Sequence, residues 1–597
     1  MSAPVTNCSA DRRRFRCPSL VADSRKIVGL LFACLIAPAA VGAPAVVVTG
    51  VEGALRDNVM AHLQLDDENC DTPSWRIRRL YKEAAADVRM ALEAFGYYAA
   101  QVDKQFESDE ECWSVILKIE AGEPVVIRNI DVRAIGDGAD SSEFRELLAK
   151  PSLRAGQILN HADYEAYKRR FNIIADRYGY FDGRFVLSRI DVYPDELAAD
   201  ITIDFDTGVR FRFGEVSFDQ DVIDLSLAQG YIDFDSGQPY DSKRITRLYE
   251  ELLATGYFLG VDIRTSPRGD PDYDVPVAIR MTAAKHRTYS GGVGFGTDVG
   301  VKLRAGFLHR RLNKKGHQFE FNGNWSDVIA DIGIGYRLPL YDPRNNWLNF
   351  DAGFKREDNV SASSDTWKIG AKKFRRQTED WLLTYSIDYG YEKWLIGVDE
   401  GSSRLLLPGV SWERIVERGP PRPLTGIKAS LSITGAADVL LSDTSFAQLR
   451  TSGKFVHPLW RGARGLGRAE LGFTIKSEFD DLPASVRFFA GGDVSVRGYE
   501  YKSLGPRDEL GFVAGGSHLA VVSYELDQLV RENWSVAAFI DAGNAFNEFK
   551  DVNVEVGVGI GVRWFSLLGP IRFDVAIPLA DDAPDDWRIH ITLGPDL

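Results

Sequence analysis

The sequence predicts a multidomain protein in which three α+β repeats precede a C-terminal transmembrane antiparallel β-barrel. A glycine followed by two aromatic residues recurs at Gly96, Gly179 and Gly256, which indicates repeated units. After Arg287, short segments of alternating apolar and polar residues replace helical periodicity. The mean hydropathy of -0.18 excludes a bundle of membrane-spanning helices but fits a barrel, whose two faces alternate. The formal net charge of -15 disfavours a nucleic-acid partner.

Residues 1–45 are predicted to be a secretory signal peptide. A basic flank precedes the charge-free apolar run Ile27–Ile36. A membrane-spanning helix is the alternative, but Pro38 and the later glycine and proline interrupt the run. The pattern leaves the cleavage site open, after either Ala39 or Ala45.

Each Gly-aromatic motif follows a stretch with three- and four-residue apolar spacing, which predicts helices over Ala84–Phe95, Tyr164–Tyr178 and Ser242–Thr255. The glycine is expected to end the helix in a left-handed conformation, and the aromatics to begin a strand. Each unit then has the order strand, helix, helix, strand, strand. This order and motif resemble POTRA domains, with predicted boundaries at 46–122, 123–206 and 207–286.

The remaining residues, 287–597, are predicted to form the barrel. Ile571, Phe573 and their neighbours alternate with Arg572 and Asp574. A soluble sandwich would have to bury these charges or leave its apolar face in water, whereas a membrane barrel places charges in the lumen. At roughly 19 residues for each strand with its turn, this segment would form about sixteen strands. The count rests in part on a resemblance to a known family.

Three motifs in the barrel carry a family resemblance: Gly491–Tyr499, Phe539–Gly543, and Gly559–Trp564 with Gly569–Asp574. They resemble the loop, strand and closing-strand motifs of the BamA/TamA superfamily of outer-membrane assembly factors. The chain's last residues, Leu593–Leu597, are similar to the TamA branch of that superfamily.

The resemblance implies a lumen lock made of Arg497, Gly498, Tyr499, Asp541 and Glu525. It places the loop that carries Arg497 inside the barrel, where a guanidinium needs carboxylate partners. Alternation puts Asp541 on the same face as Phe539, so the carboxylate can point inward. The alternative is a surface loop with a solvated arginine.

A lateral seam is expected between the first strand, near Tyr289–Phe295, and the last strand, Arg588–Leu593. Glycines in the first strand provide little side-chain packing, which weakens the pairing. The residues predicted to line the seam are Gly292, Gly294, Ile589 and Ile591.

The resemblance implies an outer-membrane assembly or translocation factor with POTRA domains in the periplasm. Its barrel would open laterally to insert or secrete unfolded client proteins such as autotransporters. The implied partners are these clients, outer-membrane lipid and a TamB-type inner-membrane-anchored protein. The alternatives are a two-partner secretion transporter, which usually carries two POTRA domains, and a passive porin or receptor.

No motif for catalysis, a cofactor or a metal is recognised, so we expect no enzymatic activity. Two cysteines remain after the predicted leader, Cys70 and Cys112. In an oxidising compartment they are expected to form one disulfide. Two buried free thiols are the alternative, because sequence does not supply the distance between them.

Overall fold

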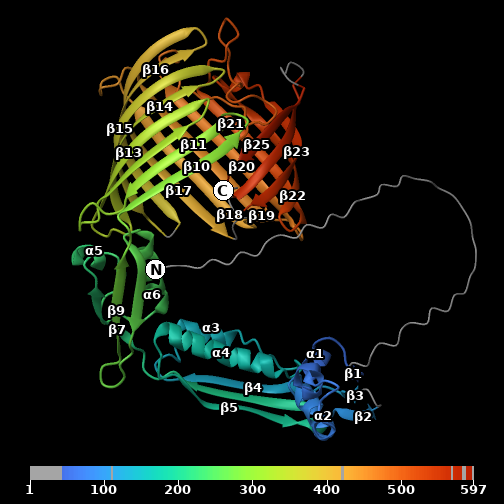
Figure 1. Cartoon of the computed structure of the whole chain (residues 1–597). Coiled ribbons are helices and arrows are strands. Elements are labelled where there is room, and N and C mark those ends of the chain that lie inside the picture. Colours follow the sequence, from blue (N-terminus) through green and yellow to red (C-terminus); the bar gives the residue numbers. More distant parts are fainter. Residues whose placement is uncertain are drawn as a thin grey trace, which may run out of the picture. The chain divides into compact units, whose positions relative to one another are not determined.

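The structure is a computed structural model (Figure 1). It describes residues 44–108, 112–378, 380–418, 422–476, 478–566, 569–580 and 586–594. The predicted leader, apart from its last two residues, and the chain's final three residues lie outside these ranges.

The N-terminal half contains three sheets of three strands, each with two helices in the same chain order. In every sheet the third strand lies between the first and the second. The elements are β1 (Ala45–Thr49), α1 (Gly53–His62), α2 (Ser74–Glu93), β2 (Gln101–Ser108), β3 (Trp113–Glu120); β4 (Val126–Ile135), α3 (Ser142–Ala149), α4 (His161–Tyr178), β5 (Arg184–Tyr193), β6 (Ala198–Asp206); and β7 (Arg212–Asp219), α5 (Leu225–Gln229), α6 (Ser242–Ala254), β8 (Phe258–Thr265), β9 (Asp274–Ala283).

The motif glycines end their helices as expected, with φ of +88° at Gly96, +80° at Gly179 and +71° at Gly256. The two aromatic residues after each glycine were predicted to begin a strand. This is wrong in the first two units, where strands β2 and β5 begin only at Gln101 and Arg184. The tyrosine of the second unit, Tyr180, is instead buried against Phe144 of α3, and a turn follows before β5 begins. The first predicted helix was also too short, because α2 begins ten residues earlier, at Ser74.

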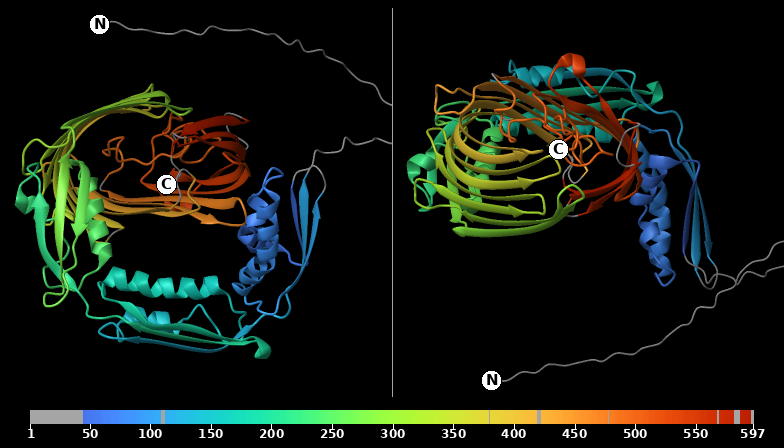
Figure 2. Two further views of the ribbon diagram at one scale, coloured as in Figure 1. Left: turned by 60° about the horizontal axis from the view of Figure 1, so that its bottom comes forward. Right: turned by 90° about the horizontal axis from the view of Figure 1, so that it is seen from above.

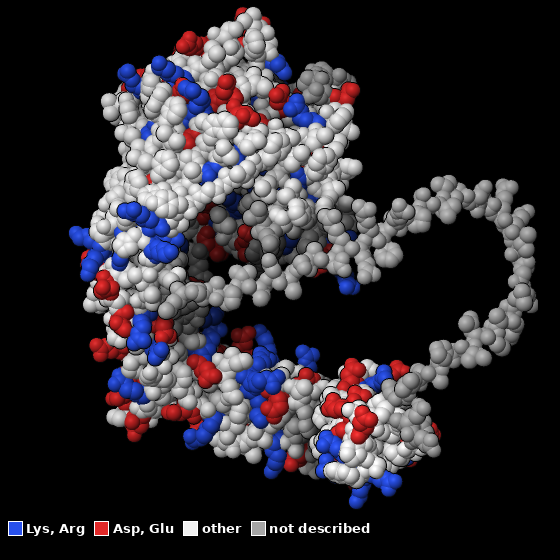
Figure 3. Space-filling view, viewed as in Figure 1, with Lys and Arg blue, Asp and Glu red and all other residues white. Residues whose placement is uncertain are grey.

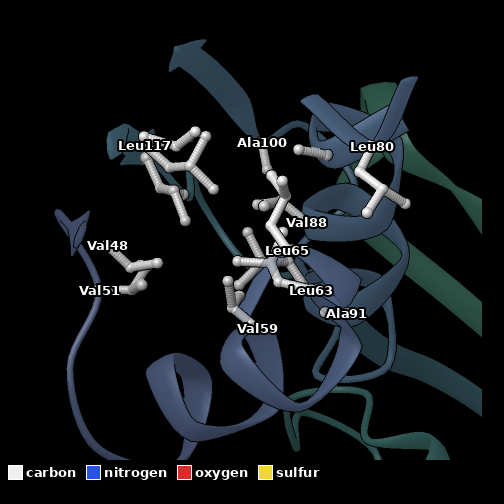
Figure 4. Packing of buried hydrophobic residues seen from close by; sticks show 14 of the residues in the cluster. Val48, Val51, Val59, Leu63, Leu65, Leu80, Val88, Ala91, Ala100 and Leu117 are labelled. Carbon is white, nitrogen blue, oxygen red and sulfur yellow. The ribbon is translucent and has the colours of Figure 1, made fainter. Parts of the chain in front are cut away.

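The first unit has its own hydrophobic core (Figure 4). Helix α2 buries Leu80, Val88 and other residues at helical spacing, and β3 buries alternate residues from Trp113 to Ile119. The two faces pack together with Leu63 and Leu65 from the segment between the helices. This packing gives the unit a core that does not depend on the barrel.

The C-terminal half is a closed barrel of sixteen antiparallel strands in chain order, β10 to β25. The strands are β10 (Arg287–Gly296), β11 (Gly300–His309), β12 (Gln318–Trp325), β13 (Ile329–Pro339), β14 (Asn346–Asp358), β15 (Ala362–Arg376), β16 (Trp381–Ile396), β17 (Asp399–Arg418), β18 (Thr425–Ala436), β19 (Phe446–Pro458), β20 (Ala463–Lys476), β21 (His518–Arg531), β22 (Trp534–Phe546), β23 (Glu555–Ser566), β24 (Gly569–Pro578) and β25 (Arg588–Leu593).

The barrel wall is apolar outside and charged inside, as the alternation predicted. On β22, Val536 and Ile540 are exposed, whereas Phe539 and Asp541, on the opposite face of the strand, are buried. On the face seen in Figure 3, charged residues gather at the rims of the barrel and other residues cover most of the wall between them. In the described part of the chain, no helix has the length and apolar character needed to cross a membrane.

Candidate functional site: a lumen loop and an incomplete seam

The segment that joins β20 to β21 folds into the lumen rather than standing outside the barrel (Figure 2). Val496 and Tyr499 are buried in a cluster with Leu519 and Val521 of β21. Between them, Gly498 has φ of +99°. A Cβ there would lie 3.0 Å from the backbone nitrogen of Pro578, so both conformation and space require glycine at this position.

Arg497 is held by three carboxylates from three strands. Its Nε and Nη2 donate to Asp541 Oδ2 and Oδ1 at 2.7 and 3.0 Å, a bidentate arrangement. Its Nη1 donates to Glu525 at 3.0 Å and to Asp574 at 3.1 Å. The guanidinium also lies over the ring of Phe539, 3.4 Å from its centroid.

Two further arginines complete this network. Arg563 contacts Glu525 at 2.9 Å and also pairs with Asp574. Arg468 lies 4.0 Å from Asp541. Three arginines therefore balance three carboxylates, which offsets the cost of removing these charges from water.

The seam between the first and last strands has little backbone pairing. Within the described residues, the register between β10 and β25 consists of Gly296 opposite Thr592. One more bond follows, from the Thr297 amide to the Ile591 carbonyl at 3.3 Å. By contrast, β10 pairs along its whole length with β11, so the barrel is weakly closed at this one junction.

The Omp85 superfamily domain matches residues 311–596, and the POTRA domain TamA domain 1 matches residues 45–121. The chain belongs to the BamA/TamA superfamily. Its barrel lies in the outer membrane and its POTRA domains lie in the periplasm.

Among curated relatives, the chain is similar to the outer membrane protein assembly factor BamA of Nitratidesulfovibrio vulgaris, with 25% identity over 382 residues that cover 60% of this chain and 48% of the relative. It is 23% identical over 437 residues to BamA of Neisseria meningitidis serogroup B, covering 60% and 53%. The chain thus spans about half the length of these relatives.

A solved structure has the same fold: BamA from Haemophilus ducreyi lacking POTRA domains 1–3, with a TM-score of 0.62 and 18% identity. The similarity covers 79% of this chain and 99% of that chain.

In this BamA/TamA superfamily member, the structure brings together all five residues predicted for the lumen lock. Besides the Arg497 contacts, Tyr499 donates to Glu555 at 2.8 Å, and the Gly498 amide donates to His590 at 2.9 Å. Sequence reasoning did not assign Arg563, Arg468 or Asp574 to this network. The alternation of β24 carried the signal for Asp574, since it already placed this residue on the lumen face.

Of the four predicted seam residues, Ile591 bonds across the seam, to the amide and hydroxyl of Thr297, but neither glycine meets an isoleucine there. Gly292 and Gly294 pair with β11, opposite Arg304 and Lys302. Ile589 and Ile591 pair with β24, opposite Val575 and Phe573. The reason is the shortness of β25, which reaches only the last residue of β10.

The two cysteines of the first POTRA domain are joined by a disulfide between Cys70 and Cys112, 42 residues apart. Cys70 follows the short 3₁₀ turn Gln64–Asp67, and Cys112 directly precedes β3. The bond therefore ties an irregular connection to the central strand of the sheet.

One group of described residues has the spacing of metal ligands: Asp298, Asp493 and His590, whose ligand atoms lie within 4.8 Å of one another. Both ring nitrogens of His590 already form hydrogen bonds, to Asp493 and to the Gly498 amide. The group is therefore satisfied by hydrogen bonds.

Proposed function

We propose that this protein assembles or translocates client proteins at the outer membrane through a barrel that opens between β10 and β25, without a chemical step. The observation that carries the proposal is the single register pair of the seam, beside fully paired neighbouring strands. A client strand that enters there gains backbone hydrogen bonds that the unpaired edge of β10 lacks.

The composition of β10 supports this use of the seam. A Cβ at Gly292 or Gly294 would come no closer than 3.8 or 3.7 Å to its neighbours, so packing does not demand glycine there. Glycine instead leaves β10 with few side-chain contacts, which lowers the cost of exchanging its partner.

The relatives named BamA are outer membrane protein assembly factors, which supports the general role. We extend the proposal to unfolded clients such as autotransporters, to contact with outer-membrane lipid, and to a TamB-type inner-membrane-anchored partner of the POTRA domains. The edges of the first POTRA sheet, β1 and β2, offer strand-addition surfaces for that partner.

The other candidate functions are less well supported. A passive porin needs an open lumen, whereas the Arg497 loop occupies this one and is fixed by buried ion pairs. A two-partner secretion transporter usually has two POTRA domains, and this chain has three sheets of that type.

The test is a disulfide across the seam, placed at the register pair with Gly296→Cys and Thr592→Cys. We expect the oxidised double variant to stop client assembly and the reduced one to restore it. Either single cysteine variant is the control and should behave like the parent under both conditions. Unimpaired assembly with a fully crosslinked seam would contradict lateral opening.

A further inference from the structure

One carboxylate oxygen of Asp493 forms hydrogen bonds on both sides of the seam. Asp493, in the lumen loop, accepts a hydrogen bond on Oδ1 from the hydroxyl of Thr297 at 2.8 Å and another from Nδ1 of His590 at 2.6 Å. Thr297 directly follows β10, and His590 lies in β25. The loop thus joins the two strands that share almost no backbone pairing.

The protonation of His590 follows from its partners. Its Nε2 lies 2.9 Å from the amide nitrogen of Gly498, which can only donate, so Nε2 is the acceptor. The ring is neutral in this arrangement, and its proton is on Nδ1, where it is donated to Asp493. The side chain is 1% exposed, so water does not compete for either bond.

The same residues connect the seam to the lumen network. Gly498 directly follows Arg497, whose guanidinium is fixed to Asp541 on β22. Thr297 contributes further, because its hydroxyl also accepts the amide hydrogen of Ile591 at 3.1 Å. The Arg497 loop is therefore bonded both to β25 and to the residue that follows β10.

We infer that His590, through Asp493 and Thr297, is a positioning residue that lets the lumen loop hold the seam closed. We call Thr297, Asp493, Gly498 and His590 the seam clasp. The inference rests on the proposed function, since it names the residues that control the opening through which clients enter. The clasp takes the place of missing backbone hydrogen bonds and can be released without unfolding either strand.

The test uses the Gly296→Cys and Thr592→Cys pair in the full chain as a reporter of closure. Thr297→Val removes the hydroxyl at nearly constant shape, and Thr297→Ser retains it. We expect the valine variant to lower the rate of spontaneous disulfide formation several-fold and the serine variant to match the parent. Equal rates for valine and serine would overturn the inference.

His590→Ala gives an independent measurement, with Ile589→Ala, on the same strand, as the matched control. We expect His590→Ala to slow crosslinking several-fold while the heat-resistant gel mobility that reports the Arg497 network persists. Loss of mobility together with unchanged crosslinking would assign His590 a purely structural role and overturn the inference. If clasp variants change closure but a locked seam still assembles clients, the proposed function fails and the clasp stands.

Discussion

At the scale of single residues, we expect Arg497 to matter most for the closing strands, because its loss leaves the buried Asp541 without its bidentate partner and takes one of two cations from Glu525 and Asp574. Removing one partner of a buried ion pair costs about 3–5 kcal/mol, because the remaining charge stays desolvated. We expect Arg497→Ala to abolish heat-resistant barrel mobility on gels and client assembly. Arg497→Lys should rescue only in part, since an ammonium cannot reproduce the bidentate contact with Asp541.

The matched control is Arg356→Ala, because Arg356 makes a similar bidentate pair with Asp365 but is 61% exposed. An exposed pair contributes roughly 0–1 kcal/mol, so this variant should retain its mobility. A silent Arg497→Ala, or equal effects of the two variants, would show that the lumen network does not brace the barrel.

Asp298 gives a pH-dependent prediction. It lies in the turn after β10, and burial, then the charge of Asp493, raises its pKa from 3.8 to about 6, although His590 acts in the opposite direction. Tyr501 also faces it. Because the folded-state pKa is raised, the ionised carboxylate destabilises the fold, and stability falls as pH rises from about 4 to about 6. Over this pH range the free energy of unfolding falls by on the order of 3 kcal/mol.

We therefore expect Asp298→Asn to stabilise the closed barrel at neutral pH, because the amide oxygen can still accept the Asp493 backbone hydrogen at this position. The measurement is the temperature at which the heat-resistant gel form is lost, at pH 4.5 and at pH 7.5. The variant should gain stability relative to the parent only at the higher pH. Parallel pH profiles for both proteins would contradict the assignment.

At the scale of structural elements, the disulfide and the central strand β3 stabilise the first POTRA domain. Closing a loop of 42 residues restricts the unfolded chain and contributes roughly 3–4 kcal/mol. We expect the double variant Cys70→Ser and Cys112→Ser to make this domain sensitive to protease in moderate urea, while the barrel stays resistant. Two reactive thiols in the oxidised parent protein would contradict the pairing.

The elements also show what the sequence can specify. Alternation identified the lumen faces of β22 and β24, because side chains on a strand have a period of two. Alternation did not predict which residues of β10 and β25 lie opposite each other at the seam. That pairing depends on how the whole barrel closes and on where β25 ends. The clasp was missed for the same reason: Thr297, Asp493 and His590 are far apart in the chain and meet only after closure.

At the scale of the whole molecule, the chain combines a barrel with periplasmic domains that have separate hydrophobic cores. The first domain buries its apolar residues within itself, so its removal should leave the barrel residues packed as before. Its outer strands, β1 and β2, each have one neighbour in the three-stranded sheet. Such edges bind an added strand through backbone hydrogen bonds, which makes this domain the expected contact for a TamB-type partner.

Removing residues 46–122 while keeping the predicted leader, 1–45, should therefore abolish co-purification of that partner. The barrel should still be inserted and should keep its heat-resistant gel mobility, because the lumen network and the seam clasp lie entirely within 287–597. The full chain purified in parallel is the control for the amount of inserted barrel. Unchanged co-purification would place the partner's contact outside the first POTRA domain. Loss of the heat-resistant form would show that barrel stability depends on that domain, contrary to the separate core of the first unit.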